Sequence, residues 1–556
     1  MKKCNQCHQP LKFTDSDHRL LHEITPVIDG KKYGLPEPDL DLQCDLQNRW
    51  SFRNHYTFYK RKSSLSGQEI ISIYSPDKTD VVYRHDEWWS DAWDATDYGR
   101  EFDFNRPFFE QFGELFKVVP KIALVQDGTS ENCDYTNFGH QNKNCYLMIG
   151  VQSEDVYYGT AYFSKDCIDC QGITQCQHCY DSMDSTNCYN GFYLKDCQNC
   201  SASRFLDDCM NCQYCVGCKN LKDKKHHIFN RPYSAEQYDQ KIKELKLNTH
   251  SGAELFKKEF ETFKLTLPFR FARQRGCEES TGDFLDGAKD CHYCFDVVRG
   301  GENCHYCVAI GLGSHHMMYC NNAEALFSYR SDGIMKGQQI FFSHFMRSCS
   351  DCFYCMYCYN CQDCFGCTGL DRKKYCIFNK QYSKEGYYRV VDRIVEWMVE
   401  AGEWGRFFPA SLSPFGYNET IAFEYFPLTK AEALEKGWKW NDHEPEVKAN
   451  RVIPAHRLPE SIQDVPDDVL NWAIECEATK KPFKIIRKEL EFYRHHGLPL
   501  PHFHPDERRR QFIKKRAPYR LWPRQCAKCQ SEIQTTYSPD RPEVVYCEHC
   551  YLKNIY

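Results

Sequence analysis

The chain has 556 residues, a formal net charge of -6 and 35 cysteines. That length exceeds what one hydrophobic core usually supports, so the class of short secreted proteins stapled by disulfides is excluded. The chain opens with MKKCNQCHQPLKF, which has no apolar leader, and no apolar run approaches the 18 or so residues of a membrane span. We therefore expect a cytoplasmic protein with no membrane partner, in which thiols are metal ligands or small buried apolar groups.

The first expected domain, residues 1–127, contains a partial metal-binding pattern followed by an acidic, aromatic segment at 86–112. The candidate zinc ligands are Cys4, Cys7 and Cys44. Gln47 stands where a CxxC pair would supply the fourth ligand, which leaves His8 or His55 as substitutes. For the acidic segment, a carboxylate site is the alternative to a solvated surface anchored by aromatic residues, and we favour the surface.

Two cysteine-rich regions follow, at 128–221 and 276–370. In the first region, Asn-Cys or Asp-Cys pairs recur at intervals of about eleven residues. Asn and Asp tolerate the left-handed conformation that tight corners need, so this pattern favours a β-solenoid of short coils. Such a coil is narrow, and small side chains such as cysteine must fill it.

The cysteine runs of these regions leave other interpretations open. The stretch CSDCFYCMYCYNCQDCFGC (349–367) has a cysteine at every third position. The candidate metal ligands in these runs are Cys209, Cys212, Cys215, Cys218, Cys358, Cys361, Cys364 and Cys367. A ferredoxin-like cluster would need a different last spacing and a following proline, and a redox CxxC would need a βαβ context that the sequence does not show.

The two cysteine-rich regions are copies of each other. CVGCKNLKDKKHHIFNRPYSAEQY (215–238) and CFGCTGLDRKKYCIFNKQYSKEGY (364–387) share about half of their residues. Helical segments follow each copy, at 222–275 and 371–450. Capping-box patterns at Ser234 and Ser251 predict helices over 235–247 and 252–264, and a third helix is expected over 387–399.

The last expected domain, residues 451–556, contains a zinc-ribbon pattern. Cys526-x2-Cys529 and Cys547-x2-Cys550 are separated by seventeen residues. Two such knuckles give four tetrahedral sulfur ligands, which fill the coordination sphere of zinc and indicate a structural site.

The two terminal domains are also related to each other. YSPDKTDVVY (74–83) matches YSPDRPEVVY (537–546), and the ribbon ligands then correspond to Ser63, Ser66, Arg84 and Glu87. Conversely, the N-terminal knuckle corresponds to Cys476, with Thr479, Glu507 and Arg510 at the other positions. The predicted fold is mainly β with helical caps, in which two cysteine-rich β-solenoid-like units are flanked by two zinc-ribbon-type modules in an A-B-B′-A′ duplication.

Two basic strips with interleaved aromatic residues occupy matching places in the terminal domains. They contain Arg49, Arg53, Lys60, Arg61 and Lys62 in the first, and Arg508, Arg509, Arg510, Lys514, Lys515, Arg516, Arg520 and Arg524 in the second. Cations for phosphate and rings for base stacking fit RNA, the ribosome or DNA. The alternative is a solvated face that pairs with the acidic remainder of the chain.

The chain shows no P-loop, Rossmann fingerprint, GxSxG or HExxH motif, so nothing in the sequence supports an enzyme. Our leading hypothesis is a non-enzymatic, zinc-stabilised binding or scaffold protein that contacts nucleic acid through the basic strips. The alternative hypothesis is a thiol-based protein for metal handling or redox chemistry.

Motifs along nearly the whole chain resemble one group of proteins. They include GLPEP, SFRN, IISIYSPDK, YGREFDFNRPFFEQF, KKYCIFNKQYS, SPFGYNET and TTYSPDRPEVVYCEHCY. In these the chain is similar to cysteine-rich, zinc-ribbon-bearing proteins encoded by candidate-phyla-radiation (Patescibacteria) genomes. The resemblance implies bound zinc and implies no activity. Gln47 and Ser63 depart from the group, in which cysteines are usual at these places.

Overall fold

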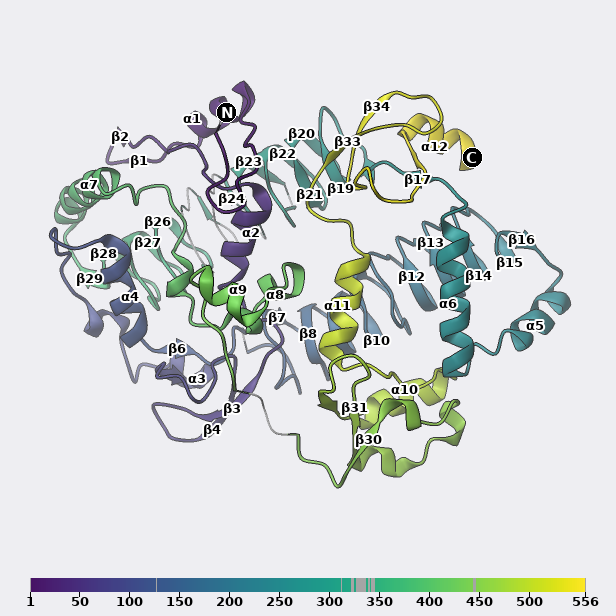
Figure 1. The fold of residues 1–556 in the computed structure, drawn as a ribbon. Coiled ribbons are helices and arrows are strands. Elements are labelled where there is room, and N and C mark those ends of the chain that lie inside the picture. Colours follow the sequence, from purple (N-terminus) through teal and green to yellow (C-terminus); the bar gives the residue numbers. More distant parts are fainter. Residues whose placement is uncertain are drawn as a thin grey trace. The chain divides into compact units, whose positions relative to one another are not determined.

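The computed structural model describes residues 2–126, 128–311, 313–321, 325–326, 337–338, 341, 346–443 and 447–555. It is a mixed fold with many short strands and several helices (Figure 1). The chain forms two compact units, each assembled from three segments. Unit 1 contains 1–123, 270–442 and 517–541, and unit 2 contains 124–269, 443–516 and 542–556. The six domains expected from sequence remain a prediction.

Unit 2 is built on a ladder of parallel strands. The ladder contains two sheets joined by isolated parallel bridges. The first contains β7 (Gly139–His140), β8 (Tyr146–Val151), β9 (Glu154–Tyr162), β10 (Lys165–Ile168) and β11 (Gln171–Thr174), and the second contains β12 (Tyr189–Lys195), β13 (Ser201–Asp207), β14 (Gln213–Lys219) and β15 (Lys225–Ile228). Partner residues lie 12 positions apart where Tyr189 pairs with Ser201 and Ser201 with Gln213. The strand β16 (Arg231–Pro232) closes the ladder by pairing antiparallel to β15.

Helices and a small sheet complete unit 2. They are α5 (Ala235–Glu244), α6 (His250–Lys264), α10 (Arg487–His496), α11 (Pro505–Lys515) and α12 (Glu548–Ile555), with β30 (Arg451–Pro454), β31 (Trp472–Glu475) and β32 (Pro482–Phe483). Ser234 caps α5 through the predicted capping box. The predicted start of α6 was wrong by two residues, because Thr249, not Ser251, accepts the capping hydrogen bond from the amide of Gly252.

Unit 1 contains a second parallel ladder. Its strands belong to two sheets. One contains β18 (Gln274–Arg275), β19 (Gly282–Asp286) and β21 (Cys294–Val297). The other contains β20 (Ala288–His292), β22 (Gly301–His305), β23 (Ser314–Met318), β24 (Ala325–Leu326), β25 (Gly337–Gln338), β26 (Ser350–Phe353), β27 (Gln362–Phe365) and β28 (Lys374–Ile377). Cys352 pairs with Cys364, and Cys364 with Cys376, so the interval is again 12 residues. The strand β29 (Lys380–Gln381) closes this ladder antiparallel to β28, as β16 does in unit 2.

The helices and hairpins of unit 1 come from the terminal segments and from the region after the ladder. They are α1 (Asp15–Glu23), α2 (Leu42–Trp50), α3 (His85–Trp88), α4 (Phe108–Val118), α7 (Lys384–Glu400), α8 (Ile421–Tyr425) and α9 (Lys430–Glu435), with β3 (Tyr59–Lys62), β4 (Glu69–Ser72), β33 (Trp522–Gln525) and β34 (Glu532–Thr535). From the acidic, aromatic segment, Phe108 is buried and packs on Phe378 and Tyr354. Its aromatic residues therefore anchor the segment, as we predicted.

Cysteines fill the interior of both ladders. In unit 2 the core contains Cys167, Cys176, Cys188, Cys200 and Cys212 among others, each at most 2% exposed. The Asn or Asp that precedes a core cysteine often has a left-handed backbone, as at Asn187 (φ 54) and Asp208 (φ 51). A corner residue that turns the chain left-handed thus directs the next thiol inward.

Candidate metal centres

The four cysteines of the predicted zinc ribbon lie together. The Sγ atoms of Cys526, Cys529, Cys547 and Cys550 are all within 4.8 Å of one another. Cys526 begins a tight turn, in which its amide donates to the carbonyl of Ser531 (2.9 Å) and its carbonyl accepts from the amide of Gln530 (2.9 Å). Of the second pair, Cys547 directly precedes α12 and Cys550 lies in its first turn.

This arrangement suits a structural zinc ion. With Zn–S bonds of about 2.3 Å, tetrahedral geometry places sulfur atoms roughly 3.8 Å apart, which is inside the 4.8 Å limit within which these four sulfurs lie. Four protein sulfurs leave no coordination position for a substrate. The buried Cys526 and Cys550 fix the site in the fold, and Cys529 is exposed. The residues fit zinc.

A second group of candidate ligands lies near the N-terminus. Atoms of Cys4, Cys7, Asp41 and Cys44 are within 4.8 Å of one another, so Asp41 takes the fourth place, not His8 or His55. Asp41 caps α2: its Oδ1 accepts from the amide of Cys44 (2.9 Å), and its Oδ2 accepts from the thiol of Cys7 (2.6 Å). Three thiols and one carboxylate are a chemically suitable donor set for zinc.

Gln47, at the place of the missing cysteine, has a different function. It accepts a hydrogen bond from the side chain of Gln6 (2.6 Å) and donates one to the hydroxyl of Tyr417 (2.7 Å). The sequence analysis missed Asp41 as a ligand. The pattern Asp41-Leu-Gln-Cys44 does contain a signal, because an Asp three residues before a helical Cys is a helix N-cap pointing at that residue.

The turn that holds Cys4 and Cys526 occurs twice more without its full set of cysteines. In each case the amide of residue i donates to the carbonyl of i+5, and the amide of i+4 donates back to the carbonyl of i. The turns start at Cys4, Ser63, Cys476 and Cys526. At Ser63 the hydroxyl donates to the carboxylate of Glu87, and in the C-terminal segment an ion pair joins Arg510 to Glu507 (3.1 Å). The residues that align with metal ligands in the duplicated sequence thus form polar contacts with each other.

The central cysteines proposed as ligands are packed as core. Cys209, Cys212, Cys215, Cys218, Cys358, Cys361, Cys364 and Cys367 are each at most 2% exposed. Each thiol donates a hydrogen bond to a backbone carbonyl two residues earlier, for example Cys212 to Met210 (3.4 Å) and Cys364 to Gln362 (3.5 Å). Among the residues that the structure describes, neither run forms a compact group of potential ligands. Metal binding by these thiols remains a prediction.

The basic strips are divided between buried and exposed residues. Arg49 is fully buried beside Asp45 (2.6 Å), and Arg508 and Arg509 are 7% and 8% exposed, in contact with Asp169 and Asp506 respectively. Three further residues form ion pairs or backbone contacts at the surface: Lys515 with Asp181, Arg516 with Asp184, and Arg61 with the carbonyl of Asp80.

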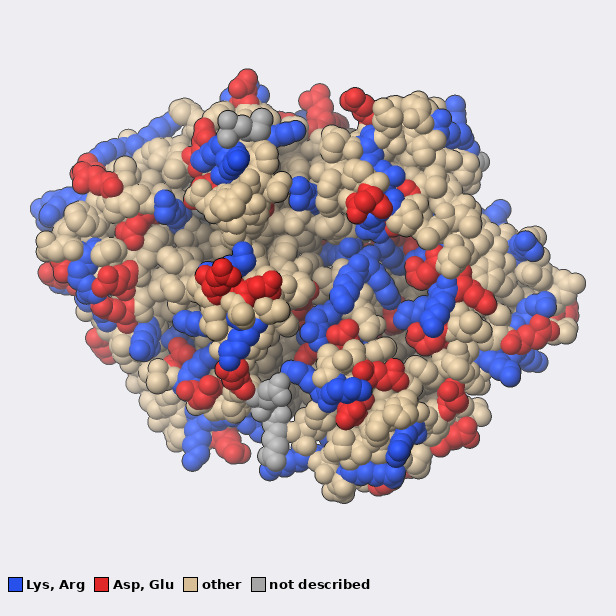
Figure 2. Space-filling view, in the orientation of Figure 1, with Lys and Arg blue, Asp and Glu red and all other residues tan. Residues whose placement is uncertain are grey.

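Arg53 is buried and Arg524 contacts the carbonyl of Ser538 (3.4 Å). Lys60, Lys62, Lys514 and Arg520 are exposed. Figure 2 shows lysine and arginine side chains gathered over α11, with acidic residues interspersed on the same face. Contact with nucleic acid remains a prediction, and it now depends on the exposed members of the strips.

Comparison with known proteins adds little to this description. No family model matches the chain. A stretch of 138 residues is 29% identical to Protein SEY1 of Candida tropicalis; it covers 24% of this chain and 16% of that protein, so the chain spans about a sixth of this relative's length. A crystal structure assigned as an acetyltransferase from Desulfovibrio desulfuricans G20 aligns with 49% of this chain and 81% of its own, at 7% identity and a TM-score of 0.10. Such a score carries no information on fold or function. Within the described residues, the search for a helix that could cross a membrane found none.

Proposed function

We propose that this chain is a zinc-stabilised scaffold or binding protein without catalytic activity of its own. The observation that carries the proposal is the tetrad of Cys526, Cys529, Cys547 and Cys550, whose sulfurs all lie within 4.8 Å of one another. In this proposal the N-terminal group of Cys4, Cys7, Asp41 and Cys44 holds a second zinc ion. Binding free energy of structural zinc stabilises the folded state, because the unfolded chain has no preformed site.

The proposal includes a finer description of the architecture. We infer that each parallel ladder is a β-solenoid with a cysteine core, because partner residues recur every 11 to 13 positions and the thiols point inward. We also infer that the four matching turns descend from one duplicated zinc-ribbon module. The shared hydrogen bonds of these turns support that inference.

Contact with RNA, the ribosome or DNA is the part of the proposal that assigns a partner. Lys514 and Arg520 support it, because they are exposed and the guanidinium of Arg520 lies 5.3 Å from the ring of Trp522. Filter binding of single-stranded RNA across a salt series tests it. We expect binding at low salt that weakens when Lys514 and Arg520 become alanine, and the same change at Lys258, which is exposed on α6, serves as control. No binding at low salt would remove the nucleic acid from the proposal and leave the zinc sites untouched.

Metal analysis tests the zinc proposal itself. Cys529→Ser removes one ligand from the exposed side of the C-terminal tetrad, and Cys277→Ser is a control because Cys277 is a partly exposed thiol outside both groups. We expect Cys529→Ser to lose about one zinc per chain and Cys277→Ser to lose none. Equal zinc content in both variants would contradict the assignment.

A further inference from the structure

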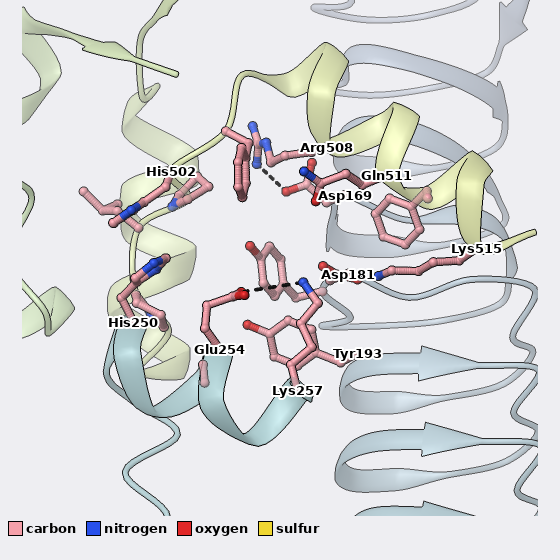
Figure 3. A pocket seen from close by; sticks show the side chains of 17 residues that line it. Asp169, Asp181, Tyr193, His250, Glu254, Lys257, His502, Arg508, Gln511 and Lys515 are labelled. Carbon is pink, nitrogen blue, oxygen red and sulfur yellow. Dashed lines mark hydrogen bonds and ion pairs between the residues drawn. The ribbon is translucent and has the colours of Figure 1, made fainter. Parts of the chain in front are cut away.

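Unit 2 contains a polar cavity that the metal centres do not explain. Its volume is about 60 Å³, and it lies between α6, α11 and the strand ladder (Figure 3). A single water needs at least about 10 to 15 Å³ by this kind of measure, so the space holds roughly four to six non-hydrogen atoms. The ladder contributes Asp169, Asp181 and Tyr193, and the two helices contribute most of the charged residues of the wall.

The charged wall consists of three ion pairs. Arg508 contacts Asp169, Lys257 lies 3.6 Å from Glu254, and Lys515 lies 3.5 Å from Asp181. Charge-assisted hydrogen bonds usually measure about 2.7 to 2.9 Å, so both lysine pairs are stretched and retain capacity for another partner. The wall has equal numbers of positive and negative groups, which disfavours a ligand of one sign and favours a ligand that carries both.

Arg508 gives the cavity an unsatisfied donor. Its Nη1 bonds Asp169, and its Nη2 lies 3.5 Å from Glu489. Its Nε has no hydrogen-bond partner among the residues that the structure describes, although the side chain is only 7% exposed. An unpaired buried donor destabilises the fold, and an oxygen of a bound carboxylate would give it a partner.

The remaining wall is formed by two histidines and by aromatic and aliphatic side chains. The rings of His250 and His502 stack at 3.5 Å, and burial together with the neighbouring His502 lowers the pKa of His250, so that it is neutral near pH 7. Tyr193 and Phe512 supply aromatic surface, against which an ammonium group packs favourably. Ala253 on α6 lines the space with only a methyl group.

From this geometry we propose that the cavity binds a small zwitterion of the size of glycine or alanine. The ligand carboxylate accepts from Arg508 at one end, and the ligand ammonium donates to Asp181 and Glu254 at the other. Figure 3 shows Arg508 and the two lysine pairs on separate sides of the space. This site is independent of the zinc centres and of nucleic-acid contact.

Isothermal titration of the zinc-loaded full chain with glycine and with alanine tests the proposal. Acetate and methylammonium, which each carry one of the two charges, are the comparison ligands. We expect saturable binding of a zwitterion at least tenfold tighter than that of either single ion. Absence of saturable binding by both amino acids would refute the proposal, and equal binding of acetate would refute the zwitterion by showing an anion site.

Two variants and a control distinguish the loss of the binding site from the loss of the folded structure. Ala253→Leu fills the cavity without changing its charge, and Glu254→Gln removes one of the two carboxylates that accept from the ligand ammonium; each is expected to weaken zwitterion binding at least tenfold. Lys258→Gln, exposed on the same helix, is the matched control and is expected to bind as the wild type does. If both cavity variants retain wild-type affinity, the ligand does not occupy this cavity and the proposal fails.

Discussion

The buried triad of Arg508, Asp169 and Glu489 allows a quantitative prediction for unit 2. Arg508→Met removes the only cation in this group, and it leaves two carboxyl groups that are 4% and 0% exposed. Removing one partner of a buried ion pair typically costs about 3 to 5 kcal/mol, because the remaining charge is left without compensation. We expect Arg508→Met to lower the free energy of unfolding of unit 2 by that amount at pH 7.

The cause of that loss can be separated from a simple packing defect. If uncompensated charge is responsible, adding Asp169→Asn and Glu489→Gln to Arg508→Met should restore a large part of the lost stability. The assay is urea unfolding followed by pulsed hydrogen exchange and mass spectrometry, read on peptides of α10 and α11. Arg487→Met, an exposed arginine on α10, is the control. A loss below about 1 kcal/mol, or no recovery in the triple variant, would refute the reasoning.

Three further predictions follow from the described residues. Burial raises the pKa of Asp169 to about 7; Arg508 opposes this rise, and Glu489 and Asp181 add to it. Because the folded pKa exceeds the unfolded value of 3.8, the stability that Asp169 contributes below pH 4 is lost as the pH rises towards 7, by up to about 4 kcal/mol. In urea titrations, the difference in unfolding free energy between the wild type and Asp169→Asn should show that slope, and a flat difference would contradict it. Gly159→Ala would place a Cβ 1.8 Å from the carbonyl oxygen of Cys170, so we expect the free energy of unfolding to fall by roughly 3 kcal/mol or more in thermal unfolding. Gly34→Ala meets no atom within 4 Å and should be nearly neutral. Equal melting temperatures of the two variants would exclude the close approach at Gly159. In the metal-free folded protein, Ellman's reagent should modify only the thiols that are not buried, namely Cys7, Cys277, Cys529 and Cys547. Rapid reaction of many more thiols would show that the cysteines inside the ladders are accessible to solvent.

Local patterns accounted for what the sequence could predict. A CxxC knuckle is one turn of chain, so its geometry at Cys526 follows from neighbouring residues alone. The helix cap at Ser234 is equally local, and its capping box forms as predicted. The regular Asn-Cys and Asp-Cys pairs indicated left-handed corners, which Asn187 and Asp208 adopt.

Local patterns of this kind could not predict contacts between residues that are far apart in the chain. Arg508 lies 339 residues from Asp169, and nothing near either residue indicates the other. The run Arg508-Arg509-Arg510 predicted exposed cations, either for nucleic acid or on a solvated face, but α11 buries its first two arginines together with Phe512. The charge run alone does not show which face of the helix is buried. The cavity is composed of segments far apart in the chain, so its lining could not be assembled from sequence.

Metal content is the measurement that tests the central claim most directly. Protein purified without oxygen or added metal should contain about two zinc ions per chain, one for each group of four ligands. Cys529→Ser and Cys4→Ser should each retain one, and the double variant none. Zinc-free folded protein, four or more metal ions per chain, or iron with visible absorbance would contradict the account and return attention to the cysteine runs of the ladders.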